Sequence, residues 1–169
     1  APEIEIDDWE PCDWVPGAGD GNAECAEALL PLDYDNPDGL DLPVMVKRRL
    51  GRGDGTGQLW LLHGGPGASA LDEMAVMAYS VRDELPDLDI YAIDHRGIGG
   101  SGKLECPDQE DPASEGGEAI VDDEWPDCIE TLEYQWADSL DEINTTNSAR
   151  DLGTLITHLA GEQQVFVYG

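Results

Sequence analysis

The chain has 169 residues, of which 38 are acidic and 8 are lysine or arginine, and its formal net charge is -30. This length suits one domain with a real hydrophobic core. The charge makes nucleic acid and anionic membrane surfaces poor partners, because the field of the whole protein repels them. Such acidity fits a heavily hydrated protein from a saline setting or a preference for cationic substrates, and a solvated surface without partners is the simpler alternative.

The first 40 residues are expected to form an extension that a disulfide pins to the rest of the chain. Residues 1–22 are rich in Pro, Gly and Asp, which is typical of loops. The four cysteines form two sequence-local pairs, which predict the disulfides Cys12–Cys25 and Cys106–Cys128, each worth roughly 3 kcal/mol. Four free buried thiols are the alternative, and the absence of a C-x-x-C pair argues against zinc. Disulfides imply an oxidising compartment, and hence export.

Residues 41–169 are expected to form the core of the domain. Residues 40–50 alternate apolar and polar side chains and predict a strand, and the glycine-rich residues 51–57 predict a hairpin turn back. A short apolar run at 59–62 predicts a strand that is buried on both faces. The predicted strands at 40–50 and 59–62 are therefore expected to be adjacent, with the second ending just before residue 63.

The stretch His63-Gly64-Gly65-Pro66-Gly67 ends this buried strand abruptly. Apolar residues at helical spacing follow over residues 69–85, so the predicted unit is strand, glycine turn and helix. Glycine lets the backbone approach a ligand closely, and the amides of Gly64 and Gly65 can stabilise a negative charge that develops on a substrate oxygen. Pro66 has no amide hydrogen to donate. A plain tight turn is the alternative interpretation of the Gly-Gly pair.

A second buried strand, residues 88–93, ends in the polar and glycine-rich segment Asp94–Ser101. Such residues lie at the carboxyl edge of a sheet, where α/β proteins bind ligands. Asp94, His95 and Ser101 are too close in sequence to form a catalytic triad, whose members converge from separate regions. Asp94 and Arg96 are instead expected to be structural, either pairing with each other or holding neighbouring loops.

The remaining residues predict a long excursion, a helix and a last strand. Residues 103–144 carry many carboxylates and no Lys or Arg after Lys103, which indicates an acidic insert on the surface, either functional or decorative. A helix with apolar residues 152, 155, 156 and 159 on one face follows, capped by one of residues 145–148 and ended by Gly161. Residues 164–168 predict a buried central strand, whose hydrophobic edge needs another chain or segment to cover it.

Three motifs of this sequence resemble those of one enzyme family. HGGPG at His63–Gly67 resembles the oxyanion-loop motif of the proline iminopeptidase branch of the α/β-hydrolases. D-x-R-G-x-G-x-S at Asp94–Ser101 resembles the second signature of that family. The order W-x-x-C, C-A, P-L-D-Y-D-x-P-D-G and HGGPG is similar to the secreted actinobacterial tripeptidyl aminopeptidases.

The resemblance implies the α/β class and the amino-terminal half of a mostly parallel α/β-hydrolase sheet flanked by helices. It also implies that an oxyanion amide lies at Gly65 or Gly64, and that His63 orients the loop rather than acting as a base. Gly169 matches the first glycine of the nucleophile elbow G-x-S-x-G, so that nucleophile, acid and base are expected on the carboxyl-terminal remainder of the hydrolase.

The function that the resemblance implies is a secreted serine hydrolase that releases residues or short peptides from free amino termini of peptides. The remainder of the hydrolase, as a second chain or a following segment, is the expected partner, and no metal or cofactor is required. The alternatives are another α/β-hydrolase, namely an esterase, epoxide hydrolase or dehalogenase, or a catalytically silent binding protein with this fold. The residue two positions after Gly169 distinguishes among them.

Overall fold

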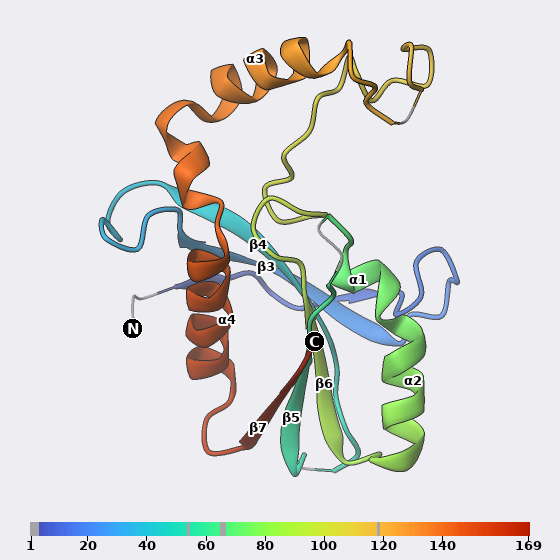
Figure 1. Cartoon of the computed structure of the whole chain (residues 1–169). Coiled ribbons are helices and arrows are strands. Elements are labelled where there is room, and N and C mark those ends of the chain that lie inside the picture. Colours follow the sequence, from blue (N-terminus) through green and yellow to red (C-terminus); the bar gives the residue numbers. More distant parts are fainter. Residues whose placement is uncertain (1–3, 54, 65–66, 118) are drawn as a thin grey trace.

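The computed structural model describes residues 4–53, 55–64, 67–117 and 119–169. The strands are β1 (Glu5–Ile6), β2 (Glu10–Cys12), β3 (Ala23–Pro31), β4 (Asp41–Arg49), β5 (Gly57–Leu61), β6 (Leu88–Ile93) and β7 (Gln164–Tyr168). The helices are α1 (Ala70–Glu73), α2 (Ala75–Glu84), α3 (Trp125–Trp136), the 3-10 helix η1 (Ala137–Glu142) and α4 (Thr145–Leu159). These elements confirm the α/β class, with α2 and α4 on opposite flanks of the sheet (Figure 1).

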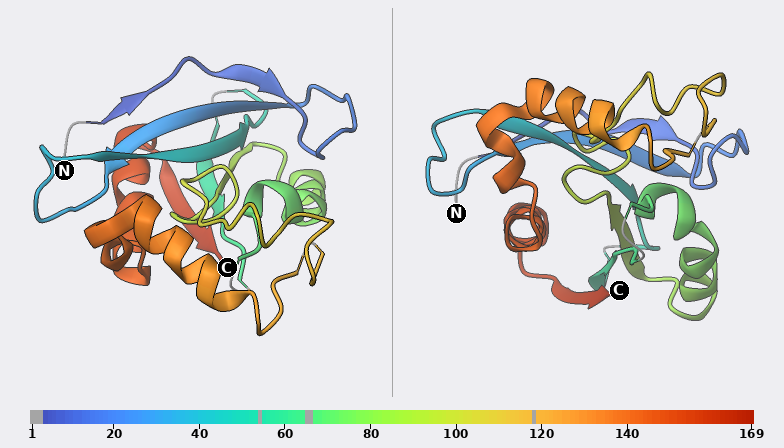
Figure 2. Two further views of the ribbon diagram at one scale, coloured as in Figure 1. Left: turned by 90° about the horizontal axis from the view of Figure 1, so that it is seen from above. Right: turned by 45° about the horizontal axis from the view of Figure 1, so that its top comes forward.

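All seven strands belong to one mixed sheet. Its order is β1-β3-β4-β6-β5-β7, with β2 also paired to β3. The pairs up to β4–β6 are antiparallel, and β6, β5 and β7 are parallel to one another. The parallel part is therefore the carboxyl-terminal side of the sheet, and β3 and β4 form a long antiparallel ribbon that curls away from it (Figure 2).

The strands bury both of their faces, in alternation. Trp60 and Tyr91 stack with ring centroids 4.6 Å apart on the face that Leu155 of α4 covers. Their neighbours Leu61 and Ile90 point to the other face, where they pack against the alanines of α1 and α2. Because successive side chains of a strand point to opposite sides, the continuous apolar runs predicted from the sequence suit a sheet that is covered twice.

The predicted hairpin at residues 51–57 is wrong. β6 lies between β4 and β5, so that β4 pairs with β6 and not with the strand that follows it in sequence. A hairpin prediction depends only on local turn residues, whereas this order depends on a later strand filling the gap. The first 40 residues also take a larger part in the sheet than an extension would, because β3 alone contributes nine residues.

Two of the predicted helix boundaries need correction. The helix expected over residues 69–85 is divided at Met74 into α1 and α2. The cap of α4 is Asn144, whose side chain accepts a hydrogen bond from the amide of Asn147, and not one of residues 145–148. Asn is among the best N-cap residues because its oxygen accepts a bond from an otherwise unpaired amide.

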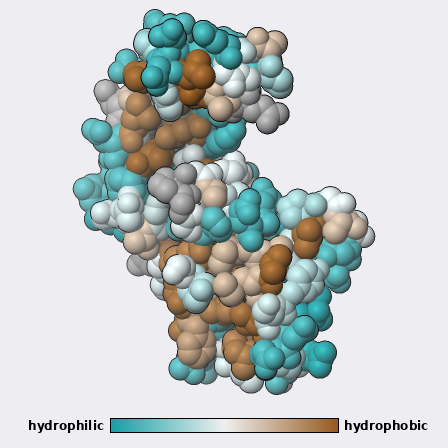
Figure 3. All heavy atoms as spheres, turned by 45° about the vertical axis from the view of Figure 1, so that its right-hand side comes forward, coloured by the Kyte–Doolittle hydropathy of each residue, from teal (hydrophilic) through white to brown (hydrophobic). Residues whose placement is uncertain are grey.

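The acidic insert contains a helix that the sequence analysis missed. α3 and η1 follow a series of turns, and the expected disulfide Cys106–Cys128 ties α3 to the start of the insert. Glu124 accepts amide hydrogen bonds from Val121, which mainly keeps its pKa low, and from Glu115, and both bonds order the turns. The insert stands away from the sheet as a separate projection, with a hollow between it and the body (Figure 3). In the described part of the chain, no helix is long and apolar enough to cross a membrane.

β7 occupies the edge of the parallel part of the sheet. Among the described strands it pairs with β5 alone, and its residues Phe166, Val167 and Tyr168 are 44%, 51% and 51% exposed. The strand that was expected to be central and buried is thus an exposed apolar edge in this chain. Such edges pair readily with further strands.

Candidate active site

The glycine-rich segment follows β5 at the carboxyl edge of the parallel strands. The amide of Leu62 donates to the carbonyl of Tyr168 across 2.8 Å, which aligns the ends of β5 and β7. Gly67 has φ of +100°, a conformation that side chains other than glycine rarely adopt. The predicted oxyanion donor Gly64 borders a cavity here, whereas Gly65 and Pro66 lie outside the described residues.

Asp94 fastens the end of the glycine segment to β6. Its carboxylate accepts hydrogen bonds from the hydroxyl of Ser69, at 2.8 and 3.0 Å, and from the amides of Leu71 and Gly100, both at 3.2 Å. The Ser69 hydroxyl in turn caps α1 by accepting from the amide of Asp72. Asp94 is 2% exposed, so these donors replace the water that its charge requires. It links two loops, and its partner is not Arg96.

Arg96 pairs with Asp151 of α4 instead. Its Nε and Nη2 donate to the two oxygens of Asp151 at 2.8 and 2.7 Å, and its remaining donors bind the carbonyls of Pro31, Leu32 and Glu142. Both side chains are buried, at 0% and 1% exposure. The guanidinium therefore holds three segments that are far apart in sequence, as its planar fork of five donors allows. Tyr34 also donates to Asp151 at 2.9 Å, and burial raises the pKa of Tyr34.

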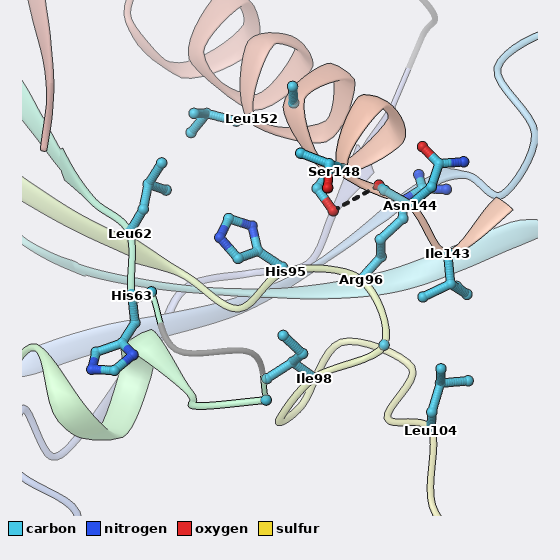
Figure 4. A pocket seen from close by; sticks show the side chains of 15 residues that line it. Leu62, His63, His95, Arg96, Ile98, Leu104, Ile143, Asn144, Ser148 and Leu152 are labelled. Atoms are coloured by element: carbon cyan, nitrogen blue, oxygen red, sulfur yellow. Dashed lines mark hydrogen bonds between the residues drawn. The ribbon is translucent and has the colours of Figure 1, made fainter. Parts of the chain in front are cut away.

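A cavity of about 750 Å³ lies between the ends of β5 and β6 and the first turns of α4 (Figure 4). Its apolar walls include Leu62, Ile98, Leu104, Ile143 and Leu152. A site of this size and character suits an apolar group of a small ligand or side chain.

Two histidines border this cavity, one from each strand end. His63 projects toward α1 and His95 toward α4 (Figure 4). The Nδ1 atom of each ring is buried and has no hydrogen-bond partner among the described residues. The orienting hydrogen bond expected of His63 is therefore absent from this nitrogen.

The short-range triad that the sequence analysis rejected is also absent from the described structure. Asp94 binds Ser69, and the hydroxyl of Ser101 accepts the amide of Met45 at 2.9 Å. Within the described part of the chain, no serine hydroxyl binds a histidine and no group of three or more His, Cys, Asp or Glu could hold a metal ion.

Sequence reasoning missed two buried charged residues, Asp151, which binds the cavity-lining Arg96, and Lys47 in β4. Asp151 lies four residues before Leu155, on the apolar face of its helix, and a carboxylate on such a face signals a buried partner. Lys47 lies in the middle of β4, where both faces of the sheet are covered, and is 5% exposed. Burial lowers its pKa.

Curated proteins with similar sequences are hydrolases. Carboxylesterase B of Mycobacterium tuberculosis is 41% identical over 81 residues, which cover 47% of this chain and 16% of that protein. The serine protease Hip1 of the same species is 25% identical over 182 residues, which cover 94% of this chain and 34% of that protein. Together with the strand order, these similarities decide the fold. The chain has an α/β-hydrolase fold.

The chain spans about a third or less of the length of the relatives named above. No family model matches it. Among solved structures, a cold-adapted esterase from an Arctic intertidal metagenomic library aligns with 94% of this chain and 55% of its own, at 15% identity and a TM-score of 0.43. Acetyl xylan esterase 1 from Thermoanaerobacterium aligns with 59% of this chain and 26% of its own, at 20% identity and a TM-score of 0.31.

Proposed function

We propose that this chain supplies the oxyanion loop and the first half of the sheet of a secreted serine hydrolase, an aminopeptidase that acts near free amino termini. The observation that carries the proposal is the glycine segment at the carboxyl edge of β5, fastened by Asp94 and bordered by a cavity. The similarity to the serine protease Hip1 over 94% of the chain supports it. The two disulfides fit an extracytoplasmic location.

The nucleophile, acid and base belong, in this proposal, to polypeptide beyond Gly169. The bond from Leu62 to Tyr168 brings the end of β7 beside the glycine segment, and a Cβ at Gly169 would lie 3.1 Å from the Cβ of Leu62. A sharp turn at Gly169 would therefore present the next residues to the start of the glycine segment at Gly64. The exposed edge of β7 is the surface that a following strand of the same hydrolase would cover.

The proposed reaction begins when a serine two positions after Gly169 attacks a peptide carbonyl. A downstream histidine takes the hydroxyl proton, and a downstream aspartate orients that histidine. The amide of Gly65, or of Gly64 as the competing choice, donates to the oxyanion, and the amide of the residue after the serine supplies the second donor. Collapse of the tetrahedral intermediate then expels the amine, which takes the proton from the histidine, and water hydrolyses the remaining ester between the acyl group and the serine.

An esterase is the second candidate function. The identity of 41% to carboxylesterase B over 81 residues favours it, and so do the apolar walls of the cavity, which suit an acyl chain as well as a side chain.

The full-length protein that contains this chain tests the proposal. We expect labelling by a fluorophosphonate, faster cleavage of a tripeptide anilide with a free amino terminus than of its acetylated form, and slower cleavage of p-nitrophenyl esters. Faster ester cleavage would select the esterase, and absence of labelling would contradict both candidates. If the nucleophile lies on a separate chain, intact-mass analysis of the purified protein should reveal that companion.

The two glycine amides can be separated by matched variants. Gly65→Pro and Gly64→Pro each remove one amide donor, and loss of the oxyanion donor should lower kcat by about 10²- to 10³-fold. A larger loss for Gly65→Pro would assign the donor to Gly65. Equal and small effects of both variants would contradict an oxyanion role for this loop.

A further inference from the structure

Lys47 is buried in β4 and makes hydrogen bonds that an apolar core residue could not make. Its Nζ donates to the carbonyl of Leu71 at 2.8 Å and to the carbonyl of Trp14 at 3.3 Å. Among the described residues, no carboxylate oxygen lies within 4.0 Å of Nζ, although Lys47 is 5% exposed. A buried ammonium group without a close counter-ion is costly, and an apolar residue would pack the position at lower cost.

The two carbonyls that Lys47 binds belong to two different segments, helix α1 and the loop that follows β2. Leu71 is the second residue of α1, directly after the glycine segment. Both backbone polar groups of Leu71 are hydrogen-bonded to charged side chains, since its amide donates to Asp94 at 3.2 Å and its carbonyl accepts from Lys47. Charges of opposite sign, Asp94 directly after β6 and Lys47 on β4, thus hold the start of the helix from two sides, as a clamp.

α1 is too short to fix its own position. It has four residues and is separated from α2 at Met74, and an isolated helix of this length is unstable in water. The position of the glycine segment therefore depends on what holds α1. Apart from Asp94 and the cap at Ser69, the polar contact that holds α1 to the sheet among the described residues is the one from Lys47.

Lys47 also joins the amino-terminal segment to the same clamp. Trp14 is 1% exposed, its carbonyl accepts from Lys47, and its indole Nε1 donates to the carbonyl of Ala75 at 3.2 Å. The disulfide Cys12–Cys25 fastens the preceding strand β2 to β3. Through their hydrogen bonds, Lys47 and Trp14 therefore connect this part of the sheet to Leu71 of α1 and to Ala75, the first residue of α2.

We propose that Lys47 is a positioning residue that sets the place of the oxyanion loop by holding the carbonyl of Leu71. This inference rests on the proposed function, because it assigns the loop amides to the oxyanion. Lys47 does not touch the substrate, and it acts through α1 on the amides that do.

The test compares Lys47→Met with Lys103→Met in the full-length protein. Lys103 is half-exposed and pairs with Glu105 at 3.3 Å on the surface, so its variant controls for loss of a lysine charge. Lys47→Met should lower kcat by about 10- to 100-fold, since small misplacements of catalytic groups have effects of this size. KM should change by less than about threefold, because ground-state binding is not affected.

Hydrogen exchange supplies a readout that does not need activity. The amides of residues 71–75 should exchange about 10-fold faster or more in Lys47→Met, while those of β5 and β6 keep their protection. Lys103→Met should leave both kcat and exchange unchanged. A Lys47→Met variant that matches this control, or that changes KM alone, would overturn the proposal.

The proposal can still be tested if Lys47→Met does not fold or if the full-length protein is inactive. Lys47→Gln keeps a neutral donor and should lose less kcat and less protection than Lys47→Met. If neither variant folds, the unmodified protein decides, since strong protection of α1 is expected and rapid exchange of the Leu71 amide would refute the clamp. If the full-length protein has no hydrolase activity, the proposed function fails, and the exchange data alone judge Lys47.

Discussion

Replacing Asp151 by Asn tests whether the buried pair with Arg96 organises the loops around the cavity. The substitution keeps the size of the side chain and removes its charge. Arg96 then retains a full charge at 0% side-chain exposure, and one amide oxygen and one NH₂ group replace the two carboxylate oxygens that it binds at 2.7 and 2.8 Å. At least one of these two donors therefore loses its acceptor.

The expected loss follows from the burial of the charge. Removing one partner of a buried ion pair costs about 3–5 kcal/mol, because the other charge remains without compensation. The carbonyls of Pro31, Leu32 and Glu142 still accept from Arg96, so a value near the lower end of that range is expected. With a urea m-value of about 2 kcal/mol/M, the midpoint of unfolding should fall by about 1.5 M.

Urea unfolding followed by circular dichroism measures this loss, with Asp35→Asn as the matched control. Asp35 is 89% exposed and 3.8 Å from Arg150, so the same chemical change there should leave the midpoint unchanged within error. A midpoint for Asp151→Asn that lies within about 0.5 M of the parent would refute the reasoning. It would mean that water or a shifted side chain replaces the lost acceptor.

Three other changes have defined outcomes. Gly97→Ala should destabilise the protein by about 1–3 kcal/mol in thermal unfolding, because Gly97 has φ of +84° and a Cβ would approach Ile143 to 2.7 Å. Replacing Cys106 and Cys128 by Ser should speed proteolysis of the acidic insert several-fold while the digestion pattern of the sheet stays the same. Asp13→Asn should lower the stability of the protein at pH 7, since the amides of Gly21 and Gly19 hold the pKa of Asp13 low. The stability that this carboxylate contributes is complete above the ordinary pKa of 3.8 and disappears as pH falls through the lowered pKa. Acid-unfolding curves of parent and variant should therefore converge at low pH.

The strands were predictable because their signal is local. Apolar runs bounded by glycine and proline predicted β4, β6 and β7 to within a residue or two. The hairpin prediction failed because the residues that pair with β4 come 41 to 47 residues later in the chain, and pairing of that kind leaves no mark on the turn between β4 and β5. α3 was missed because its apolar residues lie among many carboxylates, at positions 125, 129, 132 and 136.

The two segments of the candidate site were predictable in their position, but the hydrogen-bond partners of their side chains were not. The glycine segment and the segment after β6 were expected at the carboxyl edge, and both lie there. Sequence spacing suggested that Asp94 and Arg96 either pair or hold loops, and it could not reveal Ser69 and Asp151 as their partners. Partners 25 and 55 residues away become neighbours only through the crossover of α2 and the packing of α4.

Charged groups are buried in this chain where loops must be fixed, and this placement has a physical cause. Asp94, Arg96 and Asp151 are each 2% exposed or less, and they lie at the end of β6 or on the helix that faces it. Apolar residues of similar volume would stabilise the protein as well or better. They could not, however, accept or donate the directed bonds that hold the segments after β5 and β6 in one position. The end of the sheet thus gains a defined loop geometry at some cost in stability, which is what the proposed oxyanion site would require.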